Sequence, residues 1–164
     1  MFIPLLFSCH TNKQIVNSDK ESEILYKQAL KALEEQKFVI EAYEFRYPSK
    51  NVVKTSVGSF VSMQGHKAEI NFTSDIFPKS RWAHLVIIDP EAILTKEKAK
   101  KQSDLYKLTM KGDRNWLDRE ILITLYKNTN QCDVLVYETN TGSLLISFKG
   151  YLYPREEKDK ETGF

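Results

Sequence analysis

The sequence predicts a mainly β protein, an antiparallel meander that forms a sandwich or an open barrel and is preceded by one amphipathic helix. Hydrophobic residues recur at helical spacing over about residues 19–36. From Phe38 onward they alternate with period two, in several short segments that turn residues separate. Because the connections are short, segments that are neighbours in the sequence are expected to pair, which favours a meander.

A helix is predicted from about Asp19 to Gln36. Its start is indicated by Ser18-Asp19-Lys20-Glu21, which has the form of a capping box, with serine and glutamate satisfying amides of the first turn. One face is apolar and consists of Ile24, Leu25, Ala29, Ala32 and Leu33. We expect this face to cover one side of the sheet.

The first predicted strand follows the helix directly and ends at Pro48. Its alternation predicts two faces, one with Phe38, Ile40 and Ala42 and the other with Val39, Tyr43, Phe45 and Tyr47. A hairpin is predicted between residues 60–63 and 67–72, because Gly65 accepts the positive φ of a tight turn.

The middle of the chain is more ambiguous. A strand is predicted from Trp82 to Ile88, bent at Asp89-Pro90, with residues 92–95 as a candidate continuation. The charged run 96–101 is too polar to bury and is interpreted as the tip of a hairpin that leads into residues 105–110. A helix over 91–107 is the alternative, because alanine, glutamate and lysine favour helices.

The last third contains three apolar rows that are expected to face the core. Each row follows strand spacing, and Pro154 stops the final strand. The rows are Ile121, Ile123 and Leu125; Cys132, Val134 and Val136; and Leu144, Ile146, Phe148 and Leu152.

The N-terminus resembles the lipobox of a bacterial lipoprotein, because an apolar run is followed by Ser8 and Cys9. Acyl chains on Cys9 would anchor the chain, since each buried CH₂ contributes about 0.8 kcal/mol. Only eight residues precede Cys9 and none is basic, so the true start is expected upstream of Met1. The alternative is that residues 1–9 are an ordinary apolar end.

These interpretations divide the chain into three parts. Residues 1–18 are interpreted as a lipoprotein signal remnant and tether, and residues 19–154 as a single helix-plus-antiparallel-β domain. Residues 155–164 are interpreted as a charged C-terminal tail.

Three segments resemble the Bacteroidetes lipoprotein family known as domain of unknown function 4251. They are FVIEA at 38–42, SFVSMQGHKA at 59–68 and LLISFKGYLYP at 144–154. The resemblance spans roughly residues 20–154 and implies a cell-envelope lipoprotein without an established activity. It therefore assigns no functional residues.

Several classes of function are disfavoured. With 24 basic and 22 acidic side chains the net charge is only +2, so no field would attract nucleic acid. His10, His66 and His84 lack the spacing of zinc ligands, and we find no nucleophile motif or phosphate-binding glycine loop. We therefore expect no metal, no cofactor and no catalytic residue.

Aromatic side chains are the candidates for ligand binding. If several line one open face or a barrel mouth, they could stack on sugars or hold an apolar ligand. The alternative is that most are core and strand-rim packing. The candidates are Tyr43, Tyr47, Trp82, Trp116 and Tyr151.

Together these points favour a cell-envelope lipoprotein whose domain is a non-enzymatic binding module. The expected partners are the membrane, through a lipid anchor at Cys9, and a small ligand, a glycan or an envelope protein. The expected location is the outer membrane, facing the periplasm. The alternatives are an enzyme acting on an envelope component and an accessory subunit of an envelope assembly.

Overall fold

The computed structural model describes residues 11–48, 50–55, 57–73, 85–98, 100–114 and 117–156. These residues form the helix α1 (Thr11–Glu34) and a ten-stranded sheet whose strand pairs are antiparallel. The strands are β1 (Lys37–Tyr47), β2 (Lys50–Thr55), β3 (Phe60–Gln64), β4 (Lys67–Phe72), β5 (Leu85–Asp89), β6 (Ile93–Lys96), β7 (Ser103–Met110), β8 (Arg119–Tyr126), β9 (Gln131–Glu138) and β10 (Leu144–Pro154).

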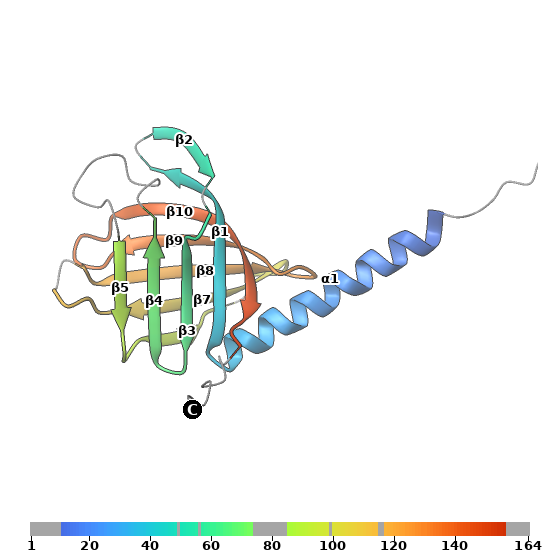
Figure 1. Ribbon diagram of the computed structural model, residues 1–164, viewed down its shortest axis with the longest axis horizontal. Helices are drawn as coiled ribbons and strands as arrows, with labels where there is room; N and C mark the ends of the chain where they lie inside the picture. The colour runs from blue at the N-terminus through green and yellow to red at the C-terminus, as the bar shows by residue number, and fades with distance from the viewer. Residues whose placement is uncertain are drawn as a thin grey trace, which may run out of the picture.

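The sheet curls into a half-barrel. In Figure 1, β5, β4, β3 and β1 stand upright in front of β10, β9, β8 and β7, which cross behind them. The strand order is β5-β4-β3-β1-β10-β9-β8-β7-β6, and β2 pairs with the second half of β1. The predicted mainly β, antiparallel fold with one helix is therefore confirmed, in its open-barrel form.

The connectivity is a meander with two further pairs between strands that are not consecutive in the chain, β1–β3 and β1–β10. Strands that follow each other in sequence pair from β3 to β5 and from β6 to β10. The β1–β10 pair joins the first strand to the last. Although β5 and β6 are consecutive in the chain, they lie at opposite ends of the strand order. Residues 93–96 are therefore a separate strand and not the expected continuation of the strand before Asp89-Pro90.

Inward-facing side chains of both halves of the sheet form the core. The rows predicted on Phe38 and in the last third are buried, except for Leu144, which is half-buried. Ala68, Ile70 and Phe72 of β4 are buried as well. Phe45, Phe72 and Phe148 meet in a three-ring cluster, with centroids 5.2 to 5.7 Å apart. Tilted and edge-to-face rings at such distances pack favourably beyond the area that they bury.

The prediction for Phe45 is wrong. It was expected on the face opposite Phe38, but it is fully buried in the core. The cause is a register shift between Ala42 and Glu44 in the pairing with β10, which inserts an extra residue at Tyr43. Such a β-bulge reverses the alternation of the residues that follow it. Arg46, rather than Phe45, consequently faces outward.

The helix begins earlier than predicted. It starts at Thr11, so Ser18 lies within it and does not cap its first turn. It ends at Glu34, and Gln36 adopts a positive φ of 56° before β1 begins. Residues 1–10 lie outside the described residues, and the signal remnant predicted there stays a prediction.

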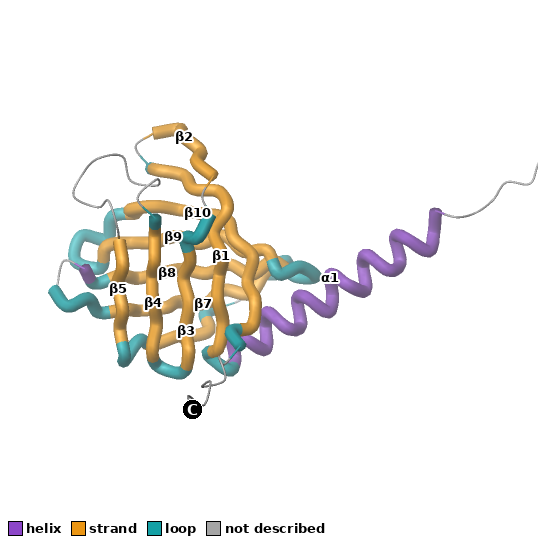
Figure 2. The backbone as a smooth tube through the Cα atoms, in the orientation of Figure 1, coloured by secondary structure: helices purple, strands orange, loops and turns teal. Residues whose placement is uncertain are grey.

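Only the C-terminal half of α1 packs against the sheet. Ala29, Ala32 and Leu33 are buried, whereas Ile24 and Leu25, expected on the same covered face, are 55% and 39% exposed. Figure 2 shows that the N-terminal part of α1 projects away from the sheet, which leaves these two side chains uncovered. The predicted apolar face is therefore covered only over its last turns.

Polar contacts hold the C-terminal half of α1 against the sheet. The Tyr26 hydroxyl donates to the Asp104 carboxylate at 2.5 Å, and this carboxylate is largely buried at the start of β7. Lys96 Nζ lies 4.0 Å from Asp104 and 3.9 Å from Glu34 of the helix. Burial, followed by the hydrogen bond to Asp104, raises the pKa of Tyr26 to about 12.

The central segment forms the predicted hairpin and not the alternative helix. β6 pairs with β7, from Ile93 opposite Thr109 to Lys96 opposite Tyr106. The buried carboxylate of Asp89 accepts hydrogen bonds from the amides of Glu91 and Lys111, at 2.9 and 2.7 Å. It therefore ties the end of β5 to the end of β7, which are not neighbours in the sheet.

Within the described residues, no helix is long and apolar enough to cross a membrane.

Phe148 tests the inward register of β10. Truncation to alanine should lower the free energy of unfolding by about 3–5 kcal/mol, because it removes one ring of the buried cluster. Lys149→Ala, on the outer face, should change it by less than about 1 kcal/mol, since its contact with Glu44 is half-exposed. Urea denaturation measures both, and equal losses would contradict the register.

Candidate functional site

Two of the predicted ligand-binding residues meet on the outer face of the sheet. The rings of Tyr43 and Tyr151 stack, with centroids 5.0 Å apart and planes inclined by 30°. Tyr151 lies opposite Glu41 in the pairing of β10 with β1, and Tyr43 is the bulged residue two positions farther along β1. Both rings are half-buried, and burial is the main cause that raises the pKa of Tyr43.

The stacked tyrosines border an open depression of about 440 Å³, which we call the aromatic groove. Half-exposed apolar side chains form much of its lining. Of the lining residues that the structure describes, Glu41 carries a charge. It is lined by Val39, Glu41, Ala42, Tyr43, Val57, Gly58, Ser59, Phe60 and Tyr151.

The loop before β3 forms one wall of the aromatic groove. The Ser59 carbonyl accepts a hydrogen bond from the Ala42 amide at 3.0 Å, which ties the loop to β1. The Ser59 hydroxyl accepts from the Thr73 amide at 3.0 Å, and Gly58 adopts a φ of 88° that favours glycine. These contacts leave Val57 on the surface, 92% exposed.

The remaining predicted site residues do not join this pair. Tyr47 lies at the far end of β1, where it packs against the core and burial raises its pKa. Trp82, Trp116 and the candidate lipidation residue Cys9 lie outside the described residues. The predicted set is therefore only partly assembled, through Tyr43 and Tyr151.

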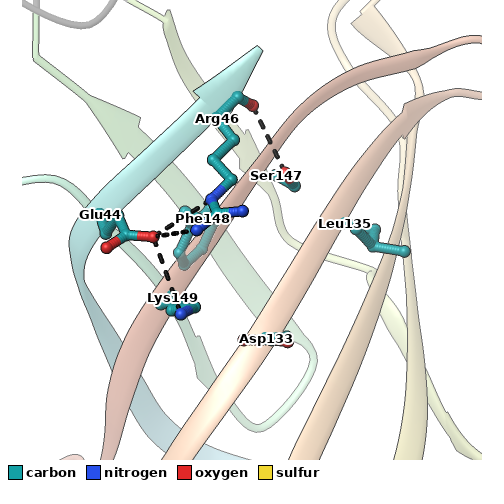
Figure 3. Close-up of a pocket in the computed structure, with 7 residues that line it drawn as sticks. All are labelled: Glu44, Arg46, Asp133, Leu135, Ser147, Phe148 and Lys149. Atoms are coloured by element: carbon teal, nitrogen blue, oxygen red, sulfur yellow. Dashed lines mark hydrogen bonds and ion pairs between the residues drawn. The ribbon is translucent and has the colours of Figure 1, made fainter. Parts of the chain in front are cut away.

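A second depression, of about 220 Å³, lies farther along the same strands, and we call it the polar hollow (Figure 3). Its charged side chains comprise two acids and two bases, which come from β1, β9 and β10. It is lined by Glu44, Arg46, Asp133, Leu135, Ser147, Phe148 and Lys149.

Glu44 organises the polar hollow. Its Oε1 accepts from Arg46 Nε at 3.2 Å and Nη2 at 3.0 Å, and Lys149 Nζ lies 3.8 Å from the same oxygen (Figure 3). The Arg46 and Lys149 side chains are still 59% and 45% exposed. Both cations are thus already neutralised in part, and both still reach solvent.

Asp133, on the other side of the polar hollow, is held by a neighbouring phenol. The Tyr126 hydroxyl donates to Asp133 Oδ2 at 2.6 Å. This hydrogen bond, followed by burial, raises the pKa of Tyr126 to about 12. The phenol is therefore a neutral donor at physiological pH, and it occupies one oxygen of the Asp133 carboxylate.

Comparison with known proteins finds similar structures. No protein-family model matches the chain, and no curated protein matches it. Three chains of known structure match. One is the crystal structure of a DUF4251 family protein from Bacteroides eggerthii DSM 20697, with a TM-score of 0.66. The alignment has 15% sequence identity and covers 83% of this chain and 91% of that chain.

The chain shares the fold of that DUF4251 protein. The resemblance to this Bacteroidetes family, first seen in three sequence segments, is thereby confirmed at the level of the fold. The name DUF4251 denotes a domain of unknown function, so the likeness transfers no activity and no site residue. The aromatic groove and the polar hollow must be interpreted from their own chemistry.

Among the described residues, no group of three or more side chains could hold a metal ion. Cys132 is fully buried, its thiol faces the Gly150 carbonyl at 3.6 Å, and burial raises its pKa strongly, so it is a poor nucleophile. His66 lies at the hairpin turn, and His84 lies outside the described residues.

The polar hollow escaped the sequence analysis. Glu44 and Arg46 are two residues apart on one strand, a spacing that places both side chains on one face, which was a usable signal. However, the bulge at Tyr43 decides which face that is. Their partners Asp133 and Lys149 come from strands about 90 to 105 residues later, and only the tertiary pairing brings them together.

Tyr126 reports on the charge of Asp133. Asp133→Asn should lower the pKa of Tyr126 from about 12 toward its ordinary value near 10, because the anionic acceptor is lost. The neutral phenol makes this hydrogen bond, so the bond is fully present below pH 10 and is lost as the pH rises through about 12. Carbon NMR of ring-labelled tyrosine measures this pKa, with Tyr126→Phe to assign the signal. An unchanged pKa in Asp133→Asn would contradict the assignment.

Proposed function

We propose that this chain is a cell-envelope lipoprotein whose β domain is a non-enzymatic binding module, and that its ligand site is the aromatic groove. The observation that carries the proposal is the stacked pair of Tyr43 and Tyr151 beside an open depression of about 440 Å³. Ligand sites are typically concave, with apolar and aromatic walls and a few placed polar groups.

The composition of the aromatic groove supports this choice. Val39, Phe60 and the two tyrosines give it apolar walls that are only half-buried. Glu41 adds one exposed carboxylate between them. When a ligand covers apolar surface that is otherwise in contact with water, the burial favours binding by roughly 25 cal/mol per Å². The carboxylate supplies orientation, because it accepts hydrogen bonds in defined directions.

The envelope location is proposed from the sequence around Cys9. Cys9 precedes α1, whose N-terminal end points away from the sheet (Figure 1). Acylation of this cysteine would therefore place the anchor next to the end of the helix that is far from the sheet. The helix would then separate the domain from the membrane surface. An α-helix rises about 1.5 Å per residue, so even its projecting half provides a spacing of more than about 15 Å.

A binding screen tests the ligand site. The 164-residue chain with Cys9→Ser, which removes the candidate lipidation site, is applied to arrays of glycans, lipids and peptides. Any ligand bound at the aromatic groove should lose more than about 1 kcal/mol of binding free energy in Tyr151→Ala, because an aromatic anchor is lost. Tyr153→Ala is the matched control, since Tyr153 is an exposed tyrosine of the same strand that does not line the groove.

Equal losses in the two tyrosine variants, or a loss in neither, would contradict the site. Urea denaturation of both variants verifies that they fold. Turnover of an array member would instead favour an enzyme acting on an envelope component.

Lipidation is tested separately. Radiolabelled palmitate should be incorporated into the protein expressed from its native gene, because Cys9 follows an apolar run and a small residue, as in a lipobox. Cys9→Ser should abolish the label, and Cys132→Ser is the control, since the Cys132 thiol is buried. Equal incorporation into Cys9→Ser would contradict the anchor.

A further inference from the structure

We propose that the ligand is an uncharged oligosaccharide that lies along β1 and occupies both the aromatic groove and the polar hollow. This inference rests on the proposed function, because it names the chemistry of the ligand for the same site. It adds the polar hollow as a second subsite, with Arg46, Asp133 and Lys149 as its recognition groups.

The two depressions follow each other along the same pair of strands. Glu41 lies opposite Tyr151 in the aromatic groove, and Glu44 lies opposite Lys149 in the polar hollow. Arg46, opposite Ser147, continues the same direction. A strand rises about 3.3 Å per residue, so the distance from Glu41 to Arg46 is about 16 Å. A single sugar ring is shorter than this path, whereas a chain of several rings can follow it.

The aromatic groove matches the apolar side of a sugar. A pyranose ring presents C–H groups on its faces and hydroxyl groups around its rim. The half-exposed rings of Tyr43, Tyr151 and Phe60 offer apolar surface to such a face. Glu41 can accept hydrogen bonds from the rim hydroxyls.

The polar hollow matches the hydroxyl groups of the following rings. A hydroxyl both donates and accepts hydrogen bonds, so it pairs best with a surface that offers both kinds of group. Arg46 and Lys149 are donors, and Glu44 and Asp133 are acceptors. The side chains of Arg46 and Lys149 are exposed enough to reach a ligand, at 59% and 45%.

The charges disfavour an anionic ligand. The charged group of a phosphodiester, sulfate or uronate accepts hydrogen bonds without donating any, and it needs cations that are not already paired. In the polar hollow both cations lie within 3.8 Å of Glu44 Oε1, and the acids equal the bases in number. In the aromatic groove the charge carried by the described residues is that of Glu41, which repels anions. A neutral chain fits both depressions.

The test uses the full chain with Cys9→Ser and defined oligosaccharides. Hexasaccharides of glucose, mannose and N-acetylglucosamine are compared with the corresponding disaccharides. A galacturonate hexamer and a heparin hexasaccharide serve as anionic probes. Isothermal titration calorimetry should show binding of at least one neutral hexasaccharide, tighter than that of its disaccharide and than that of either anionic probe.

Two variants locate the bound chain. Val57→Arg should weaken binding of the neutral hexasaccharide about tenfold, because the new side chain enters the aromatic groove. Val57 is 92% exposed, so the substitution does not threaten folding, and Val86→Arg on the exposed face of β5 is the matched control. Arg46→Ala should weaken binding of the hexasaccharide more than that of the disaccharide, since only the longer chain reaches the polar hollow.

The contradicting outcomes separate this inference from the proposed function. Preference for an anionic probe, or equal losses for both chain lengths in Arg46→Ala, overturns the inference but leaves the groove as a binding site. Binding of a lipid or peptide in a Tyr151-dependent way, with no oligosaccharide bound, does the same. If no probe of any class binds in a way that depends on Tyr151 or Val57, both proposals fall.

Discussion

The close contact of Gly150 with β1 is the constraint on which the rest of the structure depends. A Cβ atom at position 150 would lie 2.7 Å from Ile40 Cγ2 and 2.8 Å from the Glu41 carbonyl oxygen, closer than real Cβ atoms approach. Only glycine therefore lets the last strand approach the first at this point. The β1–β10 pair joins two series of antiparallel strands into one sheet. The half-barrel and its shared core therefore depend on this pair.

The candidate site is a direct consequence of the same pair. Tyr151 follows Gly150 and faces outward opposite Glu41, and the bulge at Tyr43 brings the second ring beside it. Beyond the bulge the inward residue is Phe45, which completes the core cluster with Phe72 and Phe148. The bulge in β1 thus has two effects. It places the Tyr43 ring outward in the aromatic groove and the Phe45 ring inward in the core.

The sequence predicted those parts of the fold that depend on local alternation. The helix, the hairpin at Gly65 and the buried rows of β8, β9 and β10 follow from spacing alone, because one face of each strand must be covered. The bulge could not be predicted, since neither glycine nor proline marks Tyr43. For the same reason Phe45 was assigned to the wrong face.

The candidate site was less predictable than the fold. Aromatic content nominated Tyr43 and Tyr151, but nothing in their sequence separation of more than 100 residues indicated that they stack. The Glu44–Arg46–Lys149 network depends on the β1–β10 register, which is a long-range property. Such contacts are set by the whole topology and are therefore the least accessible to reasoning from short segments.

The most direct measurement is a map of backbone amide chemical shifts for the labelled chain during titration with a bound neutral hexasaccharide. The perturbed amides are expected to cluster at Glu41, Gly58 and Tyr151 and to extend along the strands to Arg46 and Lys149. A third depression, of about 240 Å³, lies elsewhere on the sheet and includes Leu122, Tyr137 and Gly142. Perturbations confined to that depression, or to the projecting half of α1, would contradict a binding site on the outer face of the β1–β10 pair.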